Sequence, residues 1–210
     1  MKSLLILGAG GHGKVVADAA LASGLWSSLR FLDDRYQQLG HVLDCPVIGP
    51  VSALYAVITA DMDLVVALGN AAQRLEFLVA ARARGIRLGT VVHPAAVISR
   101  YATLGEGTVV LATAVVNAST SIGMGCIINT GAVIEHDCRL DDGVHACPQV
   151  GVAGNVSVGK RTWLGIGCVV REGLEVGADV TVGAGAVVVN DVPAGLTVVG
   201  VPARVLGSRA

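Results

Sequence analysis

An aliphatic residue recurs at every sixth position across the second half of the chain, from Ile98 to Val188. Fifteen of the sixteen positions in this register are Ile, Leu or Val, and the exception is Ala146. An α-helix repeats every 3.6 residues and a β-strand every two, so neither element alone produces a period of six. The period predicts a parallel β-helix in which each hexapeptide forms one side of a triangular prism.

The composition agrees with such a prism. Three hexapeptides make one coil, so the repeat supplies about five coils that bury a continuous core between them. A narrow interior has little room for rings, and the chain is 53% apolar with only 3% aromatic residues and 28 glycines. Small residues follow each aliphatic position at a distance of four, among them Ala114, Thr120, Cys126, Ala132, Cys138, Thr162 and Cys168.

The charge and cysteine content exclude several classes of protein. A formal charge of -1 with 15% charged residues argues against a nucleic acid or an anionic membrane as partner. Five cysteines without a framework spacing fit a reducing compartment better than a disulfide scaffold. No apolar run approaches the roughly 20 residues of a membrane span. We therefore expect a cytoplasmic protein.

The first ninety residues have a different pattern. Strand-like segments at 3–7, 29–34 and 62–70 alternate with helical segments at 14–24 and 71–85. Such alternation predicts a small parallel α/β sheet of Rossmann type. The expected organisation is an α/β domain over residues 1–92, followed by a β-helix with a C-terminal cap over residues 93–210.

A glycine-rich turn, "GAGGHG", follows the first predicted strand. Gly8, Gly10 and Gly13 match the G-x-G-x-x-G pattern, and Asp33 occupies the acidic position that this pattern places further along the chain. Backbone N–H groups at the start of a helix bind pyrophosphate, whether it belongs to NAD or to another nucleotide. Because so short a domain lacks the second half of a dinucleotide fold, the pattern predicts a ligand with a single nucleotide. We expect His12, inside this turn, to contact that ligand.

The segment "NTGAVIEHDCRLDDGVH" places His136 between Glu135 and Asp137, with His145 further along the same segment. One interpretation is a solvated polar corner of the prism. The other is a general base held by its neighbouring carboxylate, because imidazole titrates near pH 6.5 when unperturbed.

The order and spacing of "GAGGHG", "INTGAVIEHDC", "AGNVSVGKRTWLGIG" and "GVPAR" resemble one family over nearly the whole chain. It is the family of acetyl-CoA-dependent nucleotide-sugar N-acetyltransferases of the bacillosamine and perosamine type. Sialic acid O-acetyltransferases share its architecture. The resemblance implies a left-handed β-helix, acetyl-CoA as co-substrate without a metal, and a homotrimer whose sites lie between neighbouring prisms.

The resemblance also implies roles for individual residues. His136 would be the general base, Asp137 would orient its ring, and Glu135 flanks the pair and is a second candidate for that role. His145 would bind the acetyl carbonyl, and Gly154, one coil from His136, would let the thioester approach the backbone. The coenzyme arm would pass Ile166, Val201 and Pro202. Lys160 and Arg204 are candidates for its phosphates, and the alternative for each is a simple surface charge. The nucleotide sugar would contact Gly10, Gly11, His12, Asp33, Asp34, Gly69, Asn70 and Asn129.

The predicted reaction is transfer of acetyl to the amine of a UDP- or GDP-linked 4-amino-sugar. One alternative is O-acetylation of a sialic acid or related sugar by the same residues. Another is a non-catalytic or NAD-binding module that uses the prism only for oligomerisation. The pyrophosphate-type turn favours the first reaction, whereas the histidines and Asp137 speak against a non-catalytic module.

Overall fold

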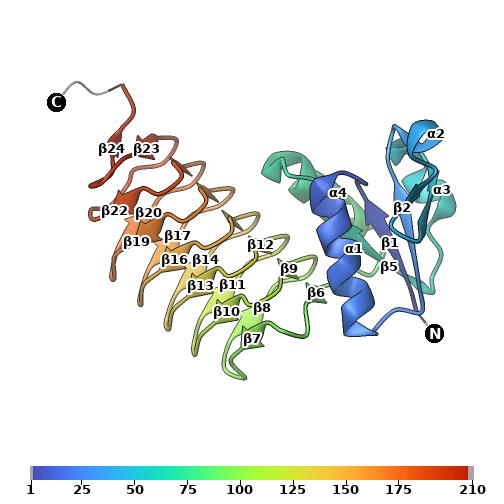
Figure 1. The fold of residues 1–210 in the computed structure, drawn as a ribbon, viewed down its shortest axis with the longest axis horizontal. Helices are drawn as coiled ribbons and strands as arrows, with labels where there is room; N and C mark the ends of the chain where they lie inside the picture. The colour runs from blue at the N-terminus through green and yellow to red at the C-terminus, as the bar shows by residue number, and fades with distance from the viewer. Residues whose placement is uncertain (1, 208–210) are drawn as a thin grey trace. The chain divides into compact units, whose positions relative to one another are not determined.

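A computed structural model describes residues 2–207, and the chain divides into two compact units, Met1–Pro94 and Ala95–Ala210. The first unit is an α/β fold and the second is a parallel β-helix, so the predicted fold class is confirmed (Figure 1). No helix among the described residues is long and apolar enough to cross a bilayer.

The α/β unit is built on a five-stranded sheet with the order β3-β4-β2-β1-β5. Its strands are β1 (Ser3–Leu7), β2 (Ser28–Leu32), β3 (His41–Val42), β4 (Cys45–Gly49) and β5 (Met62–Val66). All pairs are parallel except β3 with β4. Because Leu7 pairs with both Leu32 and Val66, the loops after β1, β2 and β5 leave the sheet at one edge.

The helices of this unit are α1 (Gly11–Ser23), α2 (Tyr36–Leu39), α3 (Leu54–Val57) and α4 (Ala71–Ala83). A short 3-10 helix, η1 (Val51–Ala53), precedes α3, and a short strand, β6 (Val91–Val92), follows α4. Helix α1 begins earlier than the sequence pattern predicted, inside the glycine-rich turn. A Cβ atom on Gly13 would lie 2.1 Å from the Gly8 carbonyl oxygen, so only glycine lets the helix start so close to the turn.

The second unit is a three-faced prism of short strands, in which strands of successive coils pair in parallel and β24 closes the end antiparallel to β23. The first face contains β7 (Val97–Ile98), β10 (Val115–Val116), β13 (Val133–Ile134), β16 (Gly151–Val152), β19 (Val169–Val170) and β22 (Val187–Val188). The second face contains β8 (Thr103–Leu104), β11 (Ser121–Ile122), β14 (Arg139–Leu140), β17 (Ser157–Val158) and β20 (Glu175–Val176). The third face contains β9 (Val109–Val110), β12 (Ile127–Ile128), β15 (His145–Ala146), β18 (Trp163–Leu164), β21 (Thr181–Val182), β23 (Thr197–Val199) and β24 (Arg204–Val205).

The second residue of each hexapeptide strand points into the prism and the first points outward. Every position of the aliphatic register from Val110 to Val188 is at most 3% exposed. The small residues predicted to fill the interior, including Thr120 and Cys138, are at most 1% exposed. The hexapeptide period therefore encodes the core. The turns between strands and the outward-facing strand residues are left to carry functional side chains.

Candidate active site

Glu135, His136 and Asp137 form the corner between the first and second faces, in the turn from β13 to β14. Asp137 adopts a left-handed backbone conformation with φ of 58°, which aspartate tolerates better than most residues. Its N–H donates to the carbonyl of Ala118 at 3.0 Å, and the carbonyl of His136 accepts from Asn155 N–H at 2.9 Å. The coils before and after this corner thus hold its backbone.

Interior side chains fix the same corner from within. The Thr120 hydroxyl donates to the Glu135 carbonyl at 2.6 Å and accepts from Cys138 N–H at 3.1 Å. The Cys138 thiol donates to the carbonyl of Ala153 at 3.1 Å, and burial raises its pKa. Cys138 is therefore an interior packing residue, as the repeat predicted. Its thiol also holds the next corner, which the repeat did not predict.

The His136 ring is held through Nδ1 by a hydrogen bond with Asp137, and its Nε2 is left to face a ligand. Its Nδ1 lies 2.8 Å from Asp137 Oδ2, and the two side chains are 62% and 57% exposed. A Cβ atom on Gly154 would lie 2.7 Å from His136 Nε2, so the ring rests over this glycine in the next coil. An imidazole paired in this way with a carboxylate can accept a proton at Nε2 from a bound nucleophile.

The side chain of Glu135 is held by the preceding coil. Its Oε2 accepts a hydrogen bond from Asn117 Nδ2 at 2.9 Å, which positions Glu135 along the corner. Asn117 did not emerge from the sequence pattern as a site residue. The signal was available, because Asn117 stands one full coil before Glu135 and so occupies the same corner of the prism.

Asn129, His145 and Trp163 form a second cluster along the third face. The Asn129 amide nitrogen lies 3.3 Å from His145 Nε2. The Trp163 ring packs edge-on to His145 with 6.4 Å between centroids and 85° between planes, and it is 39% exposed. Trp163 was also missed from sequence, although it stands one coil after His145 and pairs with it in register.

A single prism does not bring His136 and His145 together. His136 occupies the corner between the first and second faces, whereas His145 belongs to the third face, which lies opposite that corner. The spacing between them corresponds to one and a half sides of the triangle. One chain therefore carries two separate halves of the predicted site.

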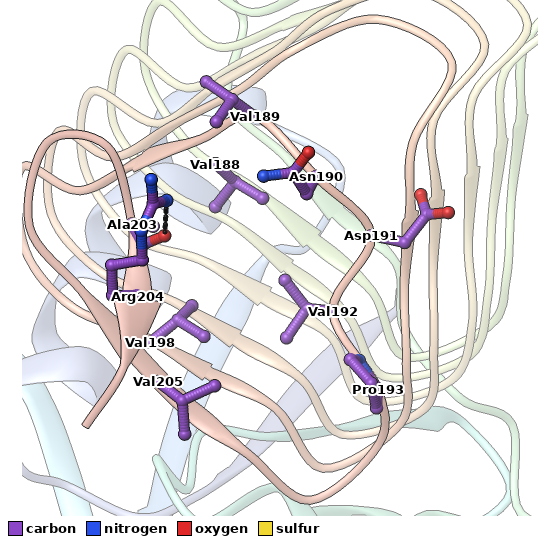
Figure 2. A pocket seen from close by; sticks show the side chains of 10 residues that line it. All are labelled: Val188, Val189, Asn190, Asp191, Val192, Pro193, Val198, Ala203, Arg204 and Val205. Atoms are coloured by element: carbon purple, nitrogen blue, oxygen red, sulfur yellow. Dashed lines mark hydrogen bonds between the residues drawn. The ribbon is translucent and has the colours of Figure 1, made fainter. Parts of the chain in front are cut away.

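The residues predicted for the coenzyme occupy two edges and one end of the prism. Ile166, which is 56% exposed, lies at the corner between the third and first faces, but Lys160 lies at the corner between the second and third. Val201 and Pro202 lie in the turn from β23 to β24. Figure 2 shows a hollow at this end, lined by Val188, Val198 and Val205, with Arg204 beside it and bonded to the carbonyl of Ala203.

In the α/β unit, the predicted nucleotide residues gather at the carboxyl edge of the sheet. Gly10 is the N-cap of α1, which begins at Gly11. The Asp33 carboxylate accepts from Ala9 N–H at 2.9 Å and from the Arg35 guanidinium, and Asp34 accepts from Val51 N–H at 2.9 Å. Both acids therefore shape the loops of this edge through bonds within the chain.

Two further residues expected at the nucleotide also hold local structure. The Asn70 side chain caps α4 by accepting from Gln73 N–H at 3.0 Å. Gly69 directly precedes Asn70, and a Cβ atom there would meet nothing within 4 Å, so its surroundings are open. His12 is half-buried, and burial followed by the positive charge of Arg74 lowers its pKa to about 4. His12 is therefore uncharged at neutral pH.

We predict that Asp33→Ala destabilises the chain at neutral pH but not in strong acid. Hydrogen bonds from Arg35 lower the pKa of Asp33 to about 2, against 3.8 for an ordinary aspartate. A lowered pKa stabilises the fold above pH 3.8 by about 2 kcal/mol, and this contribution disappears as the pH falls towards 2. Urea unfolding at several pH values measures it. An equal difference between variant and wild type at pH 7 and pH 2 would contradict this origin.

The fold and the acid-paired histidine over a glycine define a class, the hexapeptide acyltransferases with an N-terminal α/β domain. Two family models match the chain. The model of the PglD N-terminal domain matches residues 3–80, and that of the bacterial transferase hexapeptide (six repeats) matches residues 155–190. These matches cover one stretch in each unit.

Solved structures and a curated relative extend the likeness to the rest of the chain. The acetyltransferase domain of PglB from Neisseria gonorrhoeae, in complex with acetyl coenzyme A, is 43% identical, with a TM-score of 0.94 over 98% of this chain and 99% of that one. PerB from Caulobacter crescentus, in complex with CoA and GDP-perosamine, is 41% identical, with a TM-score of 0.90 over 99% and 98%. The UDP-N-acetylbacillosamine N-acetyltransferase of Bacillus subtilis is 36% identical over 113 residues, 50% of each protein, so the chain spans about half the length of this curated relative.

The chain belongs to the family of nucleotide-sugar N-acetyltransferases of the bacillosamine and perosamine type. The family predicted from the sequence is thereby confirmed.

Proposed function

We propose that this protein transfers the acetyl group of acetyl-CoA to the amine of a nucleotide-linked 4-amino-sugar. The observation that carries the proposal is His136, with Nδ1 bound to Asp137 and its ring over Gly154. The relatives support the choice of substrates, since the PglB domain binds acetyl coenzyme A and PerB binds CoA together with GDP-perosamine.

In the proposed reaction, the sugar amine attacks the thioester carbonyl while His136 Nε2 takes the proton that the amine loses. Asp137 holds the ring and stabilises the imidazolium that forms. The negative charge on the carbonyl oxygen is balanced by hydrogen-bond donors, for which the Gly154 N–H and His145 are the candidates. When the C–S bond breaks, His136 returns the proton to the leaving thiolate, which yields an amide and free coenzyme A.

Because the two halves of the site lie on different sides of one prism, we propose that each site is shared between two copies of the chain. The outward residues of the first face are Val97, Val115, Val133, Gly151, Val169 and Val187, of which Val97 is 62% exposed. The second face instead presents Thr103, Ser121, Arg139, Ser157 and Glu175. An aliphatic face of this kind suits burial against another copy.

A trimer with its first faces toward a threefold axis satisfies this geometry. The His136 corner is one edge of the first face, and the corner that carries Ile166 is the other edge. A threefold rotation brings one edge in each copy against the opposite edge in the next, which is a closed heterologous interface. His136 of one copy then approaches the Asn129 and His145 side of its neighbour.

Mixed assembly of two inactive variants tests this arrangement. We expect His136→Ala and His145→Ala each to be nearly inactive when pure. If the two are refolded together in equal amounts, random assembly gives about one site in four with both histidines intact. Recovery of about a quarter of wild-type turnover supports a shared site. No recovery in verified mixed trimers would show that both histidines must belong to one chain.

A thiol-release assay with acetyl-CoA tests the reaction itself. The acceptor panel consists of UDP- and GDP-linked 4-amino-sugars, the corresponding 4-hydroxy sugars, and sialic acids. Turnover confined to the amines supports the proposal, whereas turnover of sialic acids alone would replace it by O-acetylation.

The proposed compartment is the cytoplasm, where the buried thiols of Cys45, Cys126, Cys138, Cys147 and Cys168 stay reduced.

A further inference from the structure

Arg74 is a charged side chain in the interior of the α/β unit. It lies in the first turn of α4 and is 1% exposed. A buried guanidinium requires hydrogen-bond acceptors around it, because its desolvation is otherwise very unfavourable. Its Nη1 donates to the carbonyl of Leu68 at 2.7 Å and to the carbonyl of Gly69 at 3.2 Å.

The two carbonyls that Arg74 binds belong to the loop between β5 and α4. This loop leaves the same edge of the sheet as the glycine-rich turn after β1, since β1 and β5 are parallel and in register. In open α/β sheets, ligands bind outside this carboxyl edge. Arg74 thus acts on a loop that borders the proposed nucleotide site while it is itself too buried to touch a ligand.

Arg74 also acts on the glycine-rich turn. Its charge is one of the two causes that lower the pKa of His12, after burial. The Nε2 atom of His12 is enclosed by protein. A neutral histidine can accept a hydrogen bond at one ring nitrogen and donate at the other, whereas the charged form only donates. One buried cation therefore influences both loops at the edge of the sheet.

We propose that Arg74 is a positioning residue for the nucleotide end of the acceptor. It orders the loop that borders this end of the site by fixing the carbonyl groups of Leu68 and Gly69. With both carbonyls turned toward the buried guanidinium, the path of the 68–70 loop is set before the ligand arrives, and Asn70 starts α4 in a fixed place. A loop ordered in advance loses less conformational entropy on binding. This proposal rests on the proposed function, because it concerns the same acceptor site.

Two variants test the proposal in the 210-residue chain. Arg74→Met keeps the bulk of the side chain but removes the donors and the charge. We expect it to raise KM for the nucleotide sugar by about 10–100-fold, which corresponds to about 1.4–2.8 kcal/mol of binding free energy. KM for acetyl-CoA and kcat at saturation should stay within about twofold. Arg74→Lys, which keeps the charge without the planar fork, should restore part of the lost affinity.

The matched control is Arg84→Met, which removes an exposed arginine that also donates to a carbonyl, that of Ala80. It should change neither KM. NMR titration of His12 supplies an independent signature, with its pKa rising in Arg74→Met and staying low in Arg74→Lys. Nucleotide affinity is also measured directly, by calorimetry with UDP and GDP.

The proposal is overturned if folded Arg74→Met keeps the wild-type KM for the nucleotide sugar. It is also overturned if Arg74→Met loses affinity for the nucleotide sugar and for acetyl-CoA alike. If Arg74→Met does not fold, the same criterion applies to Arg74→Lys. Failure of the proposed function looks different. In that case wild-type protein does not acetylate nucleotide sugars, while UDP or GDP still binds and the arginine variants still weaken that binding.

Discussion

Replacement of His136 by alanine is expected to leave a folded protein that has lost most of its turnover. The side chain is 62% exposed and its ring is paired with Asp137, so its removal takes nothing from the prism core. General-base catalysis contributes roughly 10²–10⁴-fold, and kcat should fall by that factor. The measurement is thiol release at saturating acetyl-CoA and nucleotide sugar, with thermal unfolding recorded on the same sample.

The control is His41→Ala, which removes an exposed histidine from β3 of the α/β unit. It should leave kcat and both KM values unchanged. If His136→Ala also retained turnover within about threefold at neutral pH, another group would have to take the proton, and the proposed role of the corner would be wrong.

The prism could be predicted almost completely from sequence because its core depends on local spacing. Each hexapeptide step moves the chain to the next face, so the register that runs through Ile134 and Val152 defines strand, face and burial together. The same arithmetic places Gly154 beside His136, as the structure shows. The same 18-residue spacing, applied to the other predicted site residues, would also have identified Asn117 and Trp163. Each lies one coil away from a predicted site residue.

The α/β unit was less predictable, because its sheet is assembled from contacts distant in sequence. The strand Cys45–Gly49 was not anticipated, although it pairs with β2 inside the sheet. Asp33 fits the acidic position of a nucleotide fingerprint, yet its carboxylate is engaged by Ala9 and Arg35. Arg74 looks like an ordinary helical arginine in the sequence, and only the burial of its side chain distinguishes it.

The positions of His136 and His145 on different sides of the prism become apparent only after each hexapeptide has been assigned to a face. Their short spacing suggests closeness, but it is one and a half times the hexapeptide period. In the proposed mechanism, the general base and the residue that binds the acetyl carbonyl therefore lie on different sides of one chain. Assembly of several copies then becomes a requirement of the chemistry rather than an addition to it.

Gly154→Ala is expected to reduce turnover by about 10²-fold while the prism remains folded, because displacement of a reacting group by about 1 Å can have an effect of that size. The added methyl would lie 2.6 Å from His136 Cε1 and 2.7 Å from Nε2, closer than side chains approach each other. The imidazole is exposed and can swing outward, so the clash is relieved by moving the ring rather than the backbone. Thermal stability should therefore change little. Gly49→Ala, whose methyl would meet Leu32 and Ala53 at ordinary contact distances of 3.6 and 3.7 Å, is the control and should keep full turnover.

A double-mutant comparison separates displacement of His136 from obstruction of the thioester. If Gly154→Ala acts only by moving the ring, the addition of His136→Ala should abolish its separate effect, and the double variant should turn over as slowly as His136→Ala alone. If the methyl instead blocks the approach of the thioester, or removes an oxyanion contact of the backbone, the two effects multiply and KM for acetyl-CoA rises in Gly154→Ala. Independent, multiplying effects would therefore assign Gly154 to the thioester. A double variant no slower than His136→Ala would show that Gly154 acts by positioning the His136 ring. Full activity in Gly154→Ala would contradict both the positioning role and the thioester role.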